Sequence, residues 1–177
     1  VMLSPRAWGF VLALASVVLP ALPFGPLFAQ PPMPLAVLWA AYGWAAEREG
    51  GPLGEHWLQM LAALRAPIAL TALGLLHDQL AGGPYGLFVL LYLSAHLMGR
   101  IVSVNMSAPN LISLWGGFVV TAAATVAIAA LVARFLAPIA VTPYAEAALI
   151  TSLFFPIVRP LYMSATVTPR AKVGGRR

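Results

Sequence analysis

The sequence predicts an all-α integral membrane protein with six transmembrane helices and both termini in the cytoplasm. Three observations carry this prediction. Hydrophobic residues make up 61% of the 177-residue chain and charged residues only 8%, whereas a soluble domain carries about 25% charged residues. Long apolar runs are separated by segments rich in proline and glycine. The basic residues stand singly at the ends of these runs, as membrane-topology signals do.

The same composition predicts a single polytopic membrane domain, residues 1–165, followed by a basic cytoplasmic tail, residues 166–177. No polar stretch is long enough to fold as a second domain. The chain has no cysteine, which excludes disulfides, iron–sulfur clusters and thiol catalysis. The net charge of +5 is scattered rather than clustered, so nucleic acid is not an expected partner.

The first two predicted spans cover residues 6–22 and 33–46. The segment after the first span, GPLFAQ, is the candidate cleavage region of a signal peptide. It has leucine, rather than the small residue that cleavage requires, three positions before the cleavage point. We therefore expect an uncleaved helix rather than a signal peptide. The second span is entered through QPPMP, where Pro34 suits a first helical turn, and it ends at the polar stretch EREGGPLGE.

Residues 55–65 have a helical hydrophobic pattern of their own. Apolar residues share one side of a helical wheel, and Glu55, His56 and Gln59 lie opposite. This pattern predicts an amphipathic helix in the plane of the membrane interface. The alternative is one long helix that continues into the third span with a kink at Pro67. Both arrangements keep Arg65 near the lipid headgroups.

The remaining spans are expected at residues 67–80, 84–98, 111–133 and 144–162. The third and fourth are shorter than the roughly 20 residues of a perpendicular span, so we expect them to use interfacial residues or thinned bilayer. With a cytoplasmic N-terminus, only Arg134 lies outside. The bases on the inner side are Arg6, Arg48, Arg65, Arg100, Arg159, Arg170, Lys172, Arg176 and Arg177. This asymmetry is a strong positive-inside signal.

Asp78, the only aspartate, is the natural candidate for chemistry, because an ionised carboxylate is costly in hydrocarbon. Because the chain has a single aspartate, a catalytic aspartate dyad and a metal site built from several aspartates are both excluded. His77 adds a second ligand type, but neighbours on a helix point about 100° apart, so a metal site is not expected. The chain also lacks GxSxG, HExxH and GxxxxGK[ST]. We therefore expect no enzyme activity and no cofactor.

The turn after Asp78, with the sequence GGPYG, gives this carboxylate a structural task. Gly82 and Gly83 permit positive φ at a helix C-terminus, and Pro84 can start the next helix. Gly86 is expected to let the third and fourth spans approach closely. Asp78 can then accept hydrogen bonds from backbone N–H groups at the start of the fourth span. Arg134 lies at the same outer level, so an Asp78–Arg134 ion pair is a further possibility.

The order of several motifs resembles that of the rod shape-determining protein MreD family, in its alphaproteobacterial form. These are MPLAVLWAAYGWA (33–45), ALGLLHDQLAGGPYGLFVLLYLSAHLMGR (72–100), LWGGFVV (114–120) and LFFPIVRPLY (153–162). The matching core positions are Gly74, Asp78, Gly82, Gly83, Pro84 and Gly86. Tyr85 stands where the family usually has leucine, and residues 47–66 are longer and more charged than its usual linker.

The resemblance implies a non-enzymatic scaffold subunit of the cell-elongation complex in a bacterial inner membrane. It implies MreC as the direct partner, with MreB, RodA and a class B penicillin-binding protein in the wider complex that directs lateral peptidoglycan synthesis. The family fold is also similar to the substrate-binding subunits of energy-coupling-factor vitamin transporters. Such a subunit, with a pocket that opens outward near Asp78, is the alternative function.

Overall fold

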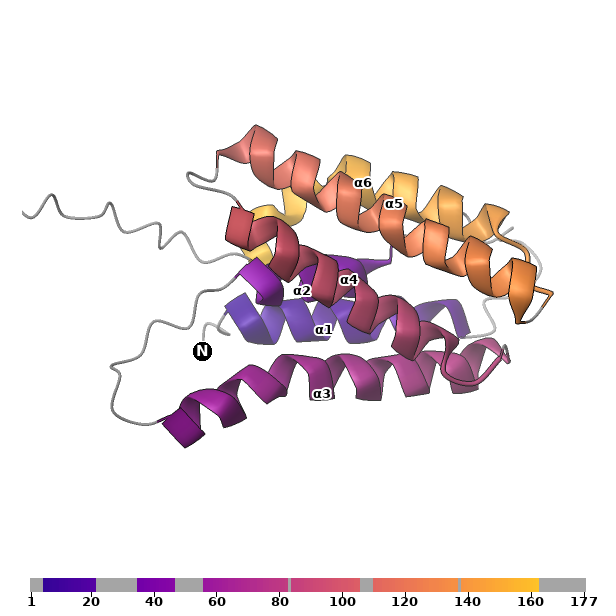
Figure 1. The fold of residues 1–177 in the computed structure, drawn as a ribbon, viewed down its shortest axis with the longest axis horizontal. Coiled ribbons are helices and arrows are strands. Elements are labelled where there is room, and N and C mark those ends of the chain that lie inside the picture. Colours follow the sequence, from indigo (N-terminus) through magenta and orange to yellow (C-terminus); the bar gives the residue numbers. More distant parts are fainter. Residues whose placement is uncertain are drawn as a thin grey trace, which may run out of the picture.

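The computed structural model describes residues 5–21, 35–46, 56–82, 84–105, 110–136 and 138–162. All regular secondary structure in these ranges is helical, which confirms the predicted all-α class (Figure 1). The elements are α1 (Pro5–Val18), the short 3-10 helix η1 (Leu19–Ala21), α2 (Ala36–Ala46), α3 (His56–Ala81), α4 (Leu87–Asn105), α5 (Leu111–Phe135) and α6 (Thr142–Tyr162). The predicted tail, residues 166–177, lies outside the described residues.

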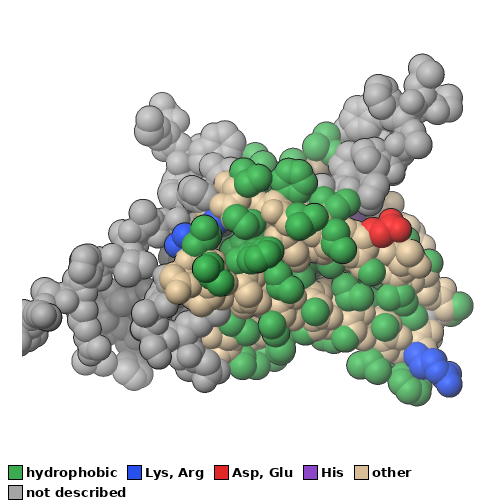
Figure 2. All heavy atoms as spheres, turned by 90° about the horizontal axis from the view of Figure 1, so that it is seen from above, with side chains coloured by type: hydrophobic (Ala, Val, Ile, Leu, Met, Phe, Trp, Pro, Cys, Tyr) green, Lys and Arg blue, Asp and Glu red, His purple; other side chains and the backbone are tan. Residues whose placement is uncertain are grey.

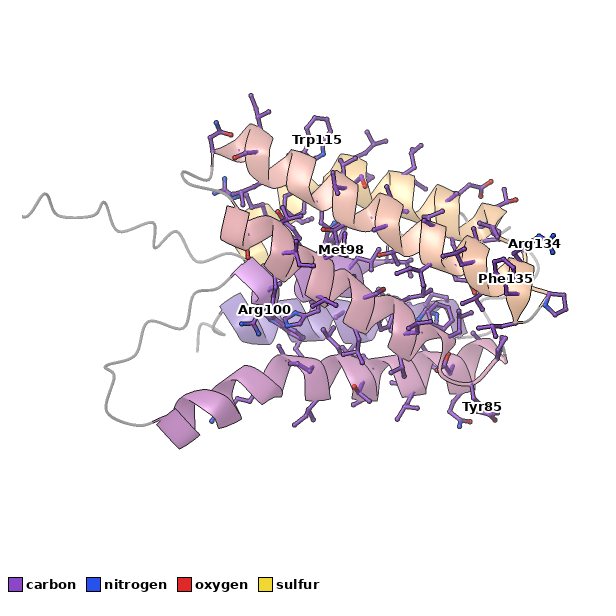
Figure 3. The ribbon with its side chains drawn as sticks, viewed as in Figure 1. Tyr85, Met98, Arg100, Trp115, Arg134 and Phe135 are labelled. Atoms are coloured by element: carbon purple, nitrogen blue, oxygen red, sulfur yellow. The ribbon has the colours of Figure 1, made fainter. Side chains whose placement is uncertain are left out.

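Successive α-helices run in opposite directions along the bundle (Figure 1). The end of α3, the start of α4, the end of α5 and the start of α6 therefore lie together at one end, at the right of Figure 1. Tyr85 and Arg134 mark this end, and Arg100 lies toward the other (Figure 3). Antiparallel order of this kind is what short connections between consecutive helices produce.

The short helix α2 forms the centre of the bundle. Every residue from Ala36 to Gly43 is buried, and α2 packs against all five other α-helices. A helix that is apolar on every side is expected in such a position. Its 11 residues correspond to a length of roughly 16 Å, about half of the hydrocarbon thickness of a bilayer.

Three aromatic rings join α2 to α5 and α6. Phe118 and Phe155 stack with ring centroids 4.4 Å apart, and Tyr42 meets both rings edge-on at 5.6 and 5.7 Å. The Tyr42 hydroxyl donates to the carbonyl of Leu114 at 3.2 Å. All three rings are fully buried. The cluster combines the edge-to-face geometry that aromatic rings favour with a partner for the buried hydroxyl.

Several helix boundaries differ from the sequence-based expectation, and the largest difference at a C-terminal end is in α4, which extends to Asn105 rather than ending at residue 98. Residues 56–65 do not form a separate helix, because α3 runs without a break from His56 through Pro67. The alternative of one long helix that continues into the third span is therefore correct, and the helix is not broken at Pro67. The fourth helix begins at Leu87 rather than at Pro84, because Pro84 takes part in a turn closed by the bond from Leu87 N–H to the Pro84 carbonyl.

Helix α5 begins where the sequence predicts. Asn110 is its N-cap residue, and its side chain accepts from Ser113 N–H at 2.7 Å. The Ser113 hydroxyl accepts in turn from Asn110 N–H at 3.0 Å. This reciprocal capping satisfies two backbone donors that the first turn of a helix leaves without partners.

Much of the outer surface is apolar. Figure 2 shows hydrophobic side chains over the middle of one face, with charged side chains toward its two ends. Among the described residues, α5 is long and apolar enough to cross a membrane, with a mean hydropathy of 2.1 over an 18-residue window of which 39% is buried. Shorter apolar stretches cover Gly9–Val18 and Leu87–Ser103.

Candidate functional site: the turn between α3 and α4

Asp78 lies in the last turn of α3 and is 1% exposed. Its Oδ2 atom accepts from Gly86 N–H at 2.8 Å, and its Oδ1 atom accepts from Phe88 N–H at 2.9 Å. These donors lie at the start of α4, where backbone N–H groups lack helical partners and the helix dipole favours an anion. The predicted bonds from the carboxylate to this helix start are confirmed.

Two glycines with positive φ shape the turn that brings Asp78 to α4. Gly82 directly follows α3 with a φ of 64°, and Gly86 directly precedes α4 with a φ of 88°. Side chains other than hydrogen are strained in this left-handed region. Gly82 therefore plays the role expected of it. Gly83, predicted for the same role, lies outside the described residues.

The close approach between α3 and α4 occurs at Gly74, not at Gly86. A Cβ atom built on Gly74 would lie 2.6 Å from the Val89 Cα atom and 2.7 Å from its backbone nitrogen. A Cβ atom on Gly86 would have no neighbour within 4 Å. The expectation that Gly86 permits tight helix packing is thus wrong. Its positive φ, required by the turn, is the physical reason for glycine there.

Three aromatic side chains surround the turn together with His77, and the sequence did not single them out as a group. The His77 ring stacks on Phe88 with centroids 3.6 Å apart and planes at 9°, and its Nδ1 atom hydrogen-bonds with the Tyr92 hydroxyl. Tyr144 of α6 lies 5.9 Å from Phe88 between ring centroids. The spacing of Phe88 and Tyr92 by four residues places them on one face of α4. That spacing is the signal by which the group could have been found.

Arg134 does not pair with Asp78. Its side chain is exposed, and its guanidinium lies over the Phe135 ring, 5.6 Å from the centroid. It extends away from the bundle at the right of Figure 3. The Asp78 carboxylate is instead satisfied by backbone donors inside the turn. The predicted ion pair is therefore absent between these two described residues.

A metal site requires several ligating side chains in one place, and a small-molecule site requires a pocket of sufficient size. The described residues contain no group of three or more histidine and carboxylate side chains that could hold a metal ion. A cavity of about 10 Å³ lies close to the site, room for one water molecule. Its lining residues are Leu35, Leu38, Leu91, Tyr92, Thr125, Val126, Tyr144 and Ala148. Small-molecule sites usually enclose roughly 300–1,000 Å³.

We expect Gly82→Ala and Gly86→Ala each to lower the free energy of unfolding by about 1–2 kcal/mol, because each places a Cβ atom in the left-handed region. Since neither Cβ would meet a neighbour, the cost is conformational and asparagine should be tolerated better than alanine. Thermal unfolding of the purified variants measures this. Equal costs for asparagine and alanine at Gly86 would contradict the conformational explanation.

No family model, no curated protein and no solved structure matches this chain. Its function is therefore inferred from the contacts around Asp78, from the distribution of its apolar and charged residues, and from the motifs described above.

Proposed function

We propose that the chain is a non-enzymatic, MreD-like scaffold of the cell-elongation complex in a bacterial inner membrane. It crosses the bilayer six times with both termini in the cytoplasm. It supports lateral peptidoglycan synthesis through MreC, within a complex that also includes MreB, RodA and a class B penicillin-binding protein. The lipid bilayer covers the rest of its surface.

The distribution of apolar surface supports the membrane part of this proposal. Large hydrophobic side chains are exposed on five of the α-helices, all except α2. Clear examples, each more than half exposed, are Ile68, Leu97, Ile112, Val120, Leu131, Leu149, Leu153 and Ile157. In water, such a surface would carry a large hydrophobic penalty, whereas lipid tails match it. α2 has no comparable exposure because its neighbours enclose it.

The described basic residues support the proposed orientation. Arg65 lies in the first half of α3, and Arg100 and Arg159 lie toward the C-terminal ends of α4 and α6. Because the helices alternate in direction, all three lie toward the same end of the bundle (Figure 1). Arg134 lies at the opposite end (Figure 3). The positive-inside rule makes the end with more basic residues cytoplasmic.

One observation carries the proposal of a scaffold rather than an enzyme. Both oxygens of the only aspartate in the chain bond to backbone N–H groups of the turn and helix that follow. A carboxylate used in this way holds two helices together, and each of its oxygens is already bonded to a backbone donor. The α3–α4 pair is thereby fixed as one unit, which suits a protein that presents a membrane-embedded face to a partner helix.

Co-purification with MreC tests this function. We expect the tagged chain, extracted from the membrane in mild detergent, to retain MreC, and an unrelated multi-pass protein with the same tag to retain none. The transporter alternative is tested in parallel by the melting temperature of the purified chain with riboflavin, thiamine or biotin. Absence of MreC together with a vitamin-dependent rise in melting temperature would overturn the scaffold proposal.

A further inference from the structure

Helix α6 contains three prolines: Pro143 in its first turn, Pro160 in its last turn, and Pro156, which lies six residues before its end. In a regular α-helix the N–H of residue 156 would bond to the carbonyl of residue 152. Proline has no N–H, and its ring also pushes against that carbonyl. The Ser152 carbonyl therefore lacks its regular partner within the helix. In an apolar environment a backbone group left in this state is strongly unfavourable.

Trp115 of α5 supplies the missing donor. Its indole Nε1–H donates to the Ser152 carbonyl at 2.8 Å. Indole is a donor without acceptor capacity, so it matches a lone carbonyl. The Trp115 side chain, labelled in Figure 3, is 39% exposed at the surface of the α5–α6 pair. The WGGF and FP motifs, separated by about 40 residues in the sequence, thus meet at a single hydrogen bond.

Helix α2 holds the same stretch of α6 from the inside of the bundle. Trp39 Nε1–H donates to the Thr151 carbonyl at 2.8 Å, one residue before Ser152. The Thr151 hydroxyl accepts from Leu35 N–H at 2.9 Å. The two carbonyls that precede Pro156 by four and five residues are thus bonded by indoles from two different helices.

We infer that α6 has a hinge at Pro156, and that the hydrogen bond from the Trp115 indole to the Ser152 carbonyl holds the helix on the two sides of this hinge in one orientation. When this hydrogen bond is removed, the segment after Pro156 (Ile157–Tyr162) becomes free to bend, because the Ser152 carbonyl then has to turn toward another donor. The hydrogen bond from Trp39 to the Thr151 carbonyl fixes the part of α6 on the N-terminal side of this hinge. This inference goes beyond the scaffold function and does not depend on it.

A double-mutant cycle tests whether the Trp115–Ser152 hydrogen bond compensates for Pro156. Trp115→Phe keeps an aromatic ring but removes the N–H, and Pro156→Ala restores the helical donor to the Ser152 carbonyl. We expect Trp115→Phe to lower the melting temperature by about 5 °C in the native background and by less than half of that in the Pro156→Ala background. Trp44→Phe, a partly buried tryptophan of α2, is the matched control, and its effect should be the same in both backgrounds. Equal effects of Trp115→Phe in the two backgrounds would overturn the inference.

Hydrogen exchange gives a second, independent result that needs only the single variant. In Trp115→Phe, amides of residues 157–159 should exchange at least about fivefold faster than in the unmodified chain, because local opening precedes exchange. Amides in the first half of α6, residues 146–149, should keep their rates. Unchanged exchange after Pro156 in a folded Trp115→Phe variant would also overturn the inference.

Discussion

Asp78→Leu is expected to lower the free energy of unfolding by roughly 4 kcal/mol, which corresponds to a fall of about 10 °C in melting temperature. Leucine offers no acceptor in place of the carboxylate. The N–H groups of Gly86 and Phe88 lose the partners that they have at 2.8 and 2.9 Å. The favourable interaction of the carboxylate with the α4 dipole is lost as well. Thermal unfolding in a fixed detergent measures the change.

The Asp78→Asn variant should have a stability between those of the Asp78→Leu variant and the native chain, with a loss of about 2 kcal/mol in the free energy of unfolding. The amide oxygen can still accept one backbone N–H, while the amide NH₂ group faces the other donor. Gln79→Leu is the matched control, because Gln79 is the exposed neighbour of Asp78, and it should change the stability by less than about 0.5 kcal/mol. Equal losses for leucine and asparagine at position 78 would show that the charge, not the acceptor geometry, matters.

Gly74→Ala is expected to cost roughly 3 kcal/mol, a large effect for a single methyl group. The added Cβ would meet the backbone of Val89 at 2.6 and 2.7 Å. A backbone cannot rotate away as a side chain can, so α3 and α4 must separate. The separation would also lengthen the bonds that Asp78 makes to the start of α4. The melting temperature of the purified variant measures the loss.

Two other helical glycines provide controls for Gly74. A Cβ on Gly116 would have no neighbour within 4 Å, so Gly116→Ala should be neutral or stabilise by up to about 1 kcal/mol through helix propensity. At Gly99 a Cβ would lie 3.0 Å from the Ala45 Cβ atom and 3.1 Å from Tyr42 Cδ2. Gly99→Ala should therefore have an intermediate effect. A Gly74→Ala variant as stable as Gly116→Ala would contradict the proposed packing.

The sequence predicted the helices well where local signals define them. Asn110 caps α5, and the apolar run that follows sets its length. The bonds from Asp78 to the start of the next helix were also predictable, because a carboxylate nine residues before a helix can fold back over a glycine turn. In both cases the position of the residue in the sequence and elementary hydrogen-bond chemistry were sufficient to predict the contact.

The sequence did not show which surfaces meet. Gly74 and Gly86 are both glycines near the turn, yet one permits helix contact and the other permits positive φ. The Trp115–Ser152 bond depends on the rotation of α5 against α6, which no local pattern reports. The absent Asp78–Arg134 pair has the same origin. A shared level in the bundle does not bring two side chains together when one points outward.

We propose that Asp78 acts by holding α3 to α4 within a scaffold that binds MreC. Capture of MreC by the tagged chain, compared among the native, Asp78→Asn and Asp78→Leu forms at equal membrane expression, tests it most directly. We expect Asp78→Asn to keep most of the captured MreC and Asp78→Leu to lose it, in the order of their melting temperatures. Equal and complete loss from two variants that melt like the native chain would contradict this claim and assign an essential charge to Asp78.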